Sequence, residues 1–263
     1  MKQALFILGM LTILFAASCQ KVVNIDLNEA DPQYVIIGNL YEGTNPFSVQ
    51  VALTTDYYGR EPQTLVNDAL VTLYDEAGTA TPVPSTGNGN YELPSFTAVS
   101  GKTYQLKVIA DGREFTATTT MPRVVPIDSI SIEWNEASGF QEEGYDVAAH
   151  FTDPAGERNF YRIIRTENDT LRNEPDDLYL LEDDYNDGKP VIANFFNRYR
   201  KGEKIEVELL TMDQSIYEFY TSLRAILNNQ NGPAPANPNT NIRGGALGYF
   251  GAFTSSKASV QLP

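Results

Sequence analysis

Residues 103–121, TYQLKVIADGREFTATTTM, decide the fold class of this chain. Tyr104, Leu106 and Val108 alternate with polar residues, and a second alternating run follows the pair Asp111-Gly112. A period of two places the apolar side chains on one face of a β-strand. Asp-Gly between two such runs favours a two-residue hairpin turn, because both turn positions need positive φ. The stretch therefore predicts two antiparallel strands with one buried face.

Similar short strands are predicted on both sides of this hairpin, with turn residues between them. Examples are YVIIGNL (34–40), FSVQVALT (47–54), SISIEW (129–134) and KIEVELLTM (204–212). Many short alternating strands at even spacing are typical of a β-sandwich. Pro122 and Pro126 interrupt the pattern and favour extended chain. We therefore expect two tandem β-sandwich domains of the immunoglobulin or fibronectin type, at 34–122 and 128–263, joined by a linker at 123–127.

One α-helix is expected inside the second domain, near residues 214–230. Ser215 and Glu218 have the spacing of a capping box. An apolar stripe at helical spacing follows, made of Ile216, Phe219, Tyr220, Leu223, Ile226 and Leu227. Asn231-Gly232 supplies a stop signal.

The N-terminus, MKQALFILGMLTILFAASC (1–19), has the pattern of a bacterial lipoprotein signal. Lys2 precedes an apolar run, and small residues then lead to Cys19, the single cysteine. We expect residues 1–18 to be removed, Cys19 to be diacylated, and residues 19–33 to form a lipidated tether. An uncleaved membrane helix and a plain cleavable signal are the alternatives, although the apolar run is short for a span of about 20 residues.

Composition limits the chemistry that the chain can perform. The formal net charge of −15 disfavours nucleic acid and anionic lipid as partners. With one cysteine there is no disulfide framework and no cysteine metal cage. His150 is the single histidine, and the sequence has no nucleophile elbow or P-loop. We expect no enzyme and no cofactor. A hydrolase built from acidic residues is a minor alternative.

Two stretches offer candidate ligand-binding side chains. LEDDYNDG (181–188) is an irregular calcium-loop candidate through Glu182, Asp183, Asp184 and Asp187. It departs from the EF-hand pattern, so a solvated acidic turn is the simpler interpretation and no metal is predicted. Aromatic pairs at Tyr57-Tyr58 and at Phe195-Phe196 with Tyr199 suit a sugar or peptide platform, although most sandwich aromatics are core residues.

The segment from Asn228 to Tyr249 is the predicted place for a partner to dock. Long segments without periodicity are often functional, and the alternative is a crossover that packs over the second sandwich. The candidate partner-contact residues are Asn237, Asn239, Asn241, Arg243, Gly244, Gly245 and Tyr249.

The ordered set of these stretches resembles a family of Bacteroidota lipoproteins classed as a domain of unknown function. It runs from the lipobox cysteine and VIIGNL through GNGNYELPSFTAVSGKTYQLKVIADGREFTATTTMP to PIDSISIEW and TNIRGGALGYFGAFTSS. Members are often encoded beside TonB-dependent receptors. The resemblance implies a lipid-anchored protein of the cell envelope, at the outer membrane, that works with such a transporter. It brings no catalytic residues.

Two further expectations depend on that resemblance. Asp128-Ser129-Ile130 and Asp169-Thr170-Leu171 match the short O-glycosylation motif of these bacteria, which makes Ser129 and Thr170 candidate glycosylation sites. Surface lipoproteins of the group often carry acids directly after the cysteine, whereas Gln20-Lys21 follows it here. The sequence therefore leaves both the medium and the periplasm open.

We accordingly expect a non-enzymatic envelope lipoprotein that is an accessory or binding component of a TonB-dependent transporter. A surface adhesin or glycan-binding module is the alternative from a different class. It requires an exposed aromatic patch in a cleft.

Overall fold

The computed structural model describes residues 31–55, 62–139, 142–228 and 237–263. The signal, Cys19, most of the tether and Tyr57-Tyr58 lie outside the described residues, so the expectations for them stay predictions. Pro32–Pro263 forms one compact unit. No helix among the described residues is long and apolar enough to cross a membrane.

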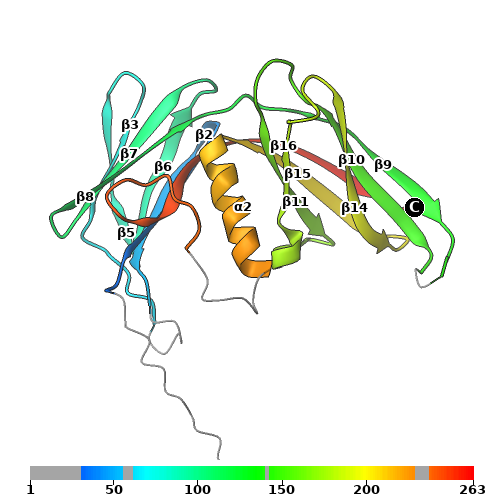
Figure 1. Cartoon of the computed structure of the whole chain (residues 1–263), viewed down its shortest axis with the longest axis horizontal. Coiled ribbons are helices and arrows are strands. Elements are labelled where there is room, and N and C mark those ends of the chain that lie inside the picture. Colours follow the sequence, from blue (N-terminus) through cyan, green and yellow to red (C-terminus); the bar gives the residue numbers. More distant parts are fainter. Residues whose placement is uncertain (1–30, 56–61, 140–141, 229–236) are drawn as a thin grey trace, which may run out of the picture. The chain divides into compact units, whose positions relative to one another are not determined.

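A nine-stranded sheet runs through both halves of this unit (Figure 1). In spatial order it contains β12 (Thr170–Leu171), β11 (Phe160–Glu167), β15 (Lys204–Met212), β16 (Leu247–Gln261), β1 (Tyr34–Tyr41), β2 (Gly43–Leu53), β6 (Asn90–Ala98) and β5 (Ser85–Gly87), while β13 (Tyr179–Glu182) pairs with β11.

Two smaller sheets cover one face of the large sheet. The four-stranded sheet has the order β4 (Ala80–Val83), β3 (Leu70–Tyr74), β7 (Thr103–Ala110) and β8 (Arg113–Thr120). The three-stranded sheet has the order β14 (Pro190–Tyr199), β10 (Gly144–Thr152) and β9 (Ile127–Asn135). Each encloses its own core against the large sheet, the first around Phe47, Leu106 and Phe250, the second around Phe151 and Leu209.

The last strand, β16, joins the two halves. Its first part pairs with β1 in parallel, and its second part pairs with β15 in antiparallel orientation. The change occurs at Phe253, which lies opposite Tyr41 on one side and Met212 on the other. A single strand therefore completes both sandwiches in turn.

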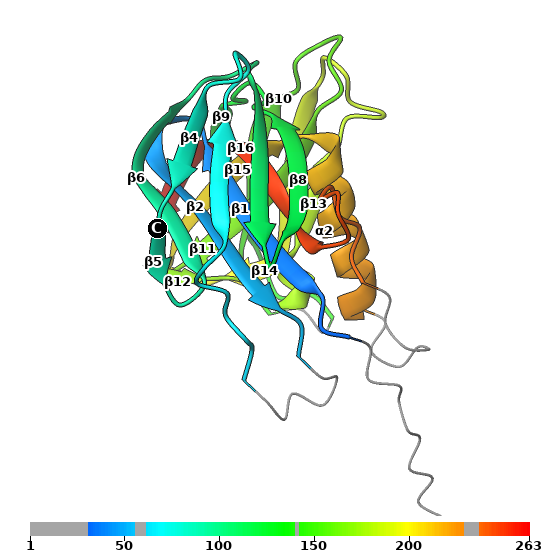
Figure 2. The same cartoon turned by 90° about the vertical axis from the view of Figure 1, so that its left-hand side faces the viewer.

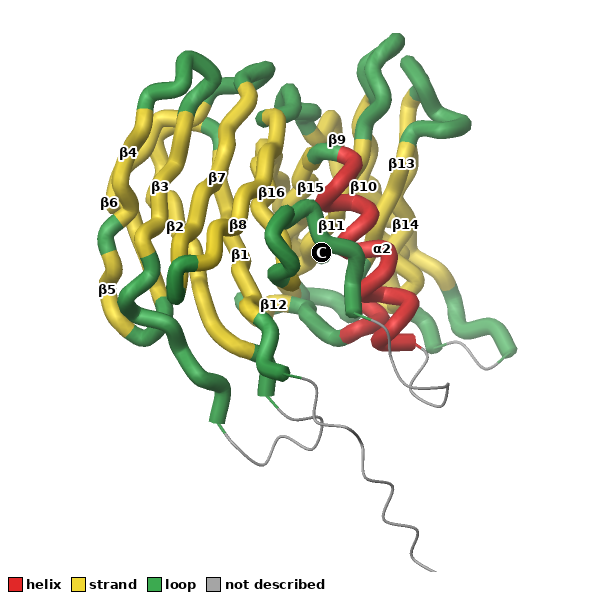
Figure 3. Tube along the Cα trace, turned by 60° about the vertical axis from the view of Figure 1, so that its left-hand side comes forward, coloured by secondary structure: helices red, strands yellow, loops and turns green. Residues whose placement is uncertain are grey.

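Helix α2 (Gln214–Asn228) packs on the other face of the large sheet (Figures 2 and 3). Ile216, Phe219 and Tyr220 are buried there with Met212 and Phe253. The predicted apolar stripe is confirmed at these helical positions. A short 3-10 helix, η1 (Pro175–Asp177), precedes β13.

The expected capping box at Ser215 is wrong, because Asp213 caps the helix instead. Its carboxylate accepts the backbone N–H of Ile216 at 3.1 Å and the hydroxyl of Ser215 at 2.7 Å. Ser215 is thus the second residue of the helix, after Gln214, and its hydroxyl donates a hydrogen bond to the capping residue.

The predicted β-sandwich class and its hairpin are confirmed. Ala110 pairs with Arg113, and both residues of Asp111-Gly112 have positive φ, 47° and 72°. The division into domains takes another form. The segment 123–127 does lead from one small sheet to the other, but Val125 is buried in the second core and the large sheet continues past this point. The two predicted sandwiches are thus halves of one unit.

Candidate functional site

An open pocket of about 960 Å³ lies where η1, β14 and the end of α2 meet. This volume is in the range of small-ligand sites, roughly 300–1,000 Å³. Its polar lining residues are Arg165, Arg172, Glu174, Asp176, Asp177, Asn194, Asn197, Arg224 and Asn228, and its apolar or aromatic ones are Pro175, Leu178, Tyr179, Phe195, Phe196 and Leu227.

Arg165 organises the floor of the pocket. Its guanidinium donates to Asp177 at 2.7 Å and to the Tyr199 hydroxyl at 2.8 Å, and it reaches Glu167 at 3.5 Å. It also lies 5.2 Å from the centre of the Phe195 ring. Only 11% of the Arg165 side chain and 8% of Asp177 are exposed, so this pair is shielded from solvent. The floor is therefore preorganised, since every acidic group in it has a cationic partner.

Burial and the nearby Glu167 carboxylate raise the pKa of the Tyr199 hydroxyl to about 12, against the opposing effect of Arg165. Tyr199 therefore stays neutral at physiological pH and donates a hydrogen bond to Glu167, at 3.0 Å. The expected aromatic platform at this position is wrong for Tyr199, which is buried because it holds the floor together.

Phe195 and Phe196 point in opposite directions, as neighbouring strand residues do. Phe195 is buried in the second core, while 92% of Phe196 is exposed at the pocket. Leaving such a ring in water forgoes about 1.5–3 kcal/mol of burial free energy. Phe196 is thus an uncovered aromatic surface beside a polar cavity.

The pocket walls present polar groups of both charge signs. Arg224 has no ion pair among the described residues, and its guanidinium reaches only the Leu178 carbonyl, at 3.5 Å. The Nε atom of Arg172 is buried without a hydrogen bond, 3.6 Å from both Glu167 and Asp177. Asp176 is exposed on η1, and the exposed Glu174 precedes it as the N-cap, where its carboxylate accepts the backbone N–H of Asp177. Arg224 and Asp176 are therefore the wall groups most available to a ligand.

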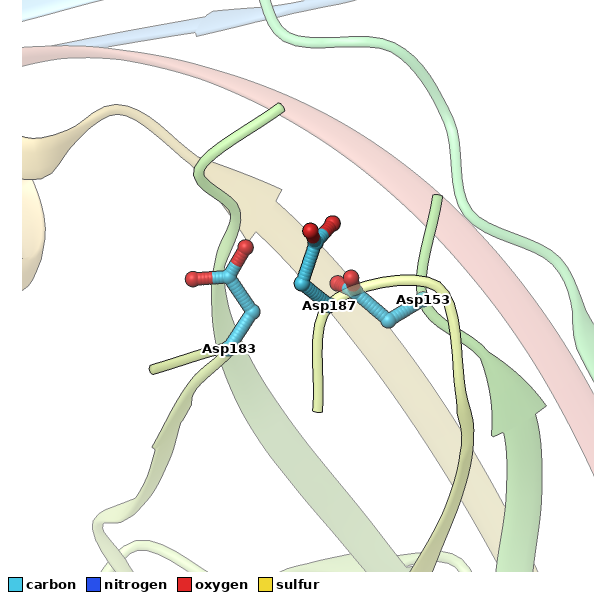
Figure 4. A group of neighbouring side chains, drawn as sticks. All are labelled: Asp153, Asp183 and Asp187. Carbon is cyan, nitrogen blue, oxygen red and sulfur yellow. The ribbon is translucent and has the colours of Figure 1, made fainter. Parts of the chain in front are cut away.

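A second polar group, Asp153, Asp183 and Asp187, gathers at the end of β10 (Figure 4). One carboxylate oxygen from each lies within 4.8 Å of the others, and Asp153 and Asp183 are buried. Oxygen atoms in this arrangement suit a hard cation such as Ca²⁺. Burial raises the pKa of the Asp153 carboxyl above its ordinary value, although hydrogen bonds from Tyr161 and Gly188 oppose the shift.

Each of these three carboxylates already accepts a hydrogen bond from another group of the protein. Asp153 accepts from the Tyr161 hydroxyl and from the Gly188 N–H, at 3.2 Å for the latter. Asp183 accepts the N–H of Asn159 at 3.0 Å, and Asp187 accepts that of Gly156 at 2.6 Å. The group therefore fastens the loop 153–159 to the loop 183–189.

The sequence placed a different set of acids together in this loop. Glu182 and Asp184 turn away and pair with Arg158, at 3.3 and 3.0 Å. Asp153, which completes the group with Asp183 and Asp187, was missed. Its turn, Asp153-Pro154-Ala155-Gly156, was visible in the sequence, but only the pairing of β10 with β14 brings it beside residues 183–188.

The structure places the predicted partner-contact residues in two environments. Two of them are used inside the fold, because Asn241 bonds the backbone of Phe250 at 2.8 and 3.0 Å, and Tyr249 is buried under α2 with hydrogen bonds to Asn39 and Tyr220. Burial leaves Tyr249 little surface for a partner, whereas Asn241 is half-buried and its role as a contact stays a prediction. The others, Asn237, Asn239, Arg243, Gly244 and Gly245, are exposed.

The backbone of Arg243 forms an isolated β-bridge with strand β8. It exchanges hydrogen bonds with Thr116 of β8, at 2.7 and 3.2 Å, which ties the segment to the first sandwich. Its side chain makes no ion pair among the described residues. Partner contact through the exposed residues stays a prediction.

The remaining sites lie on the surface or in ordinary strand positions. Ser129 is exposed on β9, and Thr170 is exposed at a hairpin end, so both are accessible to modification, which stays a prediction. His150 lies on β10 and makes a 2.7 Å hydrogen bond with Ser131. This is an ordinary hydrogen bond between neighbouring strands.

The fold and the pocket define a β-sandwich protein with an open, mixed-charge pocket. The chain belongs to the family described as domain of unknown function (DUF4249), whose model matches residues 20–259. It is similar to a two-domain fibronectin type III segment of chicken tenascin, at 13% identity, 69% coverage of this chain and 91% of that one, with a TM-score of 0.23. A search of curated proteins finds no match.

Proposed function

We propose that this protein is a non-enzymatic, lipid-anchored envelope protein that acts as an accessory or binding component of a TonB-dependent outer-membrane transporter. The observation that carries the binding role is the pocket at η1, β14 and α2, with an uncovered Phe196 at its edge. The lipoprotein signal and the family resemblance support the location and the transporter partner.

The chemistry of the pocket supports binding rather than catalysis. Its described lining residues include no Ser, Thr, Cys, His or Lys, so its candidate proton carriers are Tyr179 and three acids. Asp177 is already paired with Arg165, and the two remaining acids, Glu174 and Asp176, come from one exposed turn. A hydrolase would need a positioned acid and base on either side of a substrate.

Affinity purification of the full chain from native membranes in mild detergent tests the proposal. We expect a TonB-dependent transporter to co-purify, and we expect the Cys19→Ala chain to lose both lipid labelling and this association. If no transporter is recovered while a glycan array gives a clear signal, an adhesin-like glycan-binding role replaces the proposal. If Cys19→Ala still incorporates labelled palmitate, the lipid anchor is wrong.

A further inference from the structure

We propose that the pocket at η1, β14 and α2 binds a neutral carbohydrate, with one sugar ring stacked on Phe196 and its hydroxyl groups bonded to the arginines and acids of the walls. This inference rests on the proposed binding role and names the chemical class of the ligand.

Phe196 provides the first part of the argument. It is the most exposed large apolar side chain among the described residues, at 92%. The neighbouring Asn194 and Asn197 supply planar amide groups on the same strand. A ring with one free face and polar groups around its edge matches a sugar, which has an apolar C–H face and a rim of hydroxyls.

The charges of the walls select a neutral ligand. The pocket contains three arginines and three acids, although acids far outnumber bases in the whole chain, at 34 to 19. An anionic ligand would meet Glu174 and Asp176, and a cationic one would meet Arg172 and Arg224. A hydroxyl group both donates and accepts, so it can bond an arginine N–H and a carboxylate together. Neutral polyols satisfy both walls at once.

A peptide is the competing ligand, because β14 is an edge strand to which another strand could add. Tyr179 and η1 line the same pocket as Asn194, so they stand beside this edge. An added strand would have to pass both. The observations therefore favour a ligand that enters the pocket over one that extends the sheet.

Calorimetric titration of the full chain, in a detergent without a sugar headgroup, tests the inference. The probes are neutral oligosaccharides of glucose, mannose, galactose and xylose, with oligogalacturonate and a mixed hexapeptide library as the charged and peptide probes. The variants are Phe196→Ala and Arg224→Gln. Their matched controls are Tyr185→Ala, whose ring is 87% exposed outside the pocket, and Arg243→Gln.

We expect at least one neutral oligosaccharide to bind, and each pocket variant to weaken it about tenfold while both controls leave it unchanged. Melting temperatures near the wild-type value in all four variants exclude unfolding as the cause. Binding of no neutral probe, equal binding by Phe196→Ala, or binding of the acidic or peptide probes alone would overturn the inference. If a transporter still co-purifies in those cases, the proposed function survives without it.

Discussion

Gly248 lies directly opposite Ile36 where β16 pairs in parallel with β1, and a Cβ atom at Gly248 would stand 2.0 Å from the Ile36 carbonyl oxygen. Gly248 also has a φ of 94°, a backbone conformation that residues with a side chain rarely adopt. The parallel pairing of the last strand with the first strand therefore depends on this glycine. We predict that Gly248→Ala destabilises the fold by about 3 kcal/mol or more, from steric overlap and backbone strain together, measured by urea unfolding.

Gly78 provides the control for this prediction. It has a φ of 80° in a turn, but a Cβ atom there would meet nothing within 4 Å. Gly78→Ala should therefore cost only the backbone term, about 1–2 kcal/mol. Equal losses in the two variants would show that overlap with Ile36 contributes nothing.

The start of α2 gives a second prediction. Besides capping the helix, Asp213 accepts the hydroxyl of Thr119 at 2.5 Å, so it joins β8 of the first half to the helix. We predict that Asp213→Ala costs about 2 kcal/mol, from the lost cap and the lost side-chain bond. Ser215→Ala should cost less than half as much in the same thermal unfolding assay. A larger loss at Ser215 would restore the capping box expected from the sequence.

The sequence predicts features with local causes better than it predicts which strands lie side by side. Alternation and the Asp111-Gly112 turn identify strands because their causes are local, within a few residues. The parallel pairing of residues 35–41 with 247–253 has no local cause, since alternation states which face is buried but not which strand lies beside it. The expectation of two separate sandwiches assigned residues 247–261 to the second sandwich alone for this reason.

The candidate site was harder to predict for the same physical reason. The pocket is assembled from β11, η1, β14 and α2, which lie far apart in the sequence. Phe195 and Phe196 were recognised as aromatic, but the sequence could not state which one faces solvent. The segment before β16 had the composition of a binding loop, yet Asn241 and Tyr249 are used inside the fold. Asparagine and glycine serve turns and close packing as readily as they serve ligands.

The Arg165–Asp177 pair at the pocket floor gives a third prediction. Arg165→Met would leave Asp177 shielded from solvent with only Arg172, at 3.6 Å, as a cationic partner, and we expect a loss at the lower end of about 3–5 kcal/mol in urea unfolding. Arg123→Met is the control, because Arg123 and its partner Glu157 have 73% and 46% of their side chains exposed. That change should stay below about 1 kcal/mol. If both cost the same, the floor is not preorganised by Arg165.

The last prediction concerns the pH dependence contributed by Asp153. Burial raises the pKa of its carboxyl above the ordinary value of 3.8, so the folded protein holds this proton more tightly than the unfolded chain does. The resulting stabilisation is fully present below pH 3.8 and is lost as the pH rises through the folded pKa. Once the carboxylate is charged, its bonds from Tyr161 and Gly188 offset part of the cost of burying that charge.

Asp153→Asn removes this titration, so the unfolding free energies of the two proteins should diverge across that window. We expect the wild-type value minus the variant value to fall as the pH rises from 3.8, because only the wild type must bury a new charge. The same substitution at exposed Asp128 corrects for the chemistry of the change.

Tyr161→Phe adds an independent check, because it removes the donor that offsets the buried charge. Its cost should be larger at pH 7 than below pH 3.8, since hydrogen bonds to charged groups are the stronger ones. A cost independent of pH would mean that Asp153 is not charged in the folded protein at pH 7.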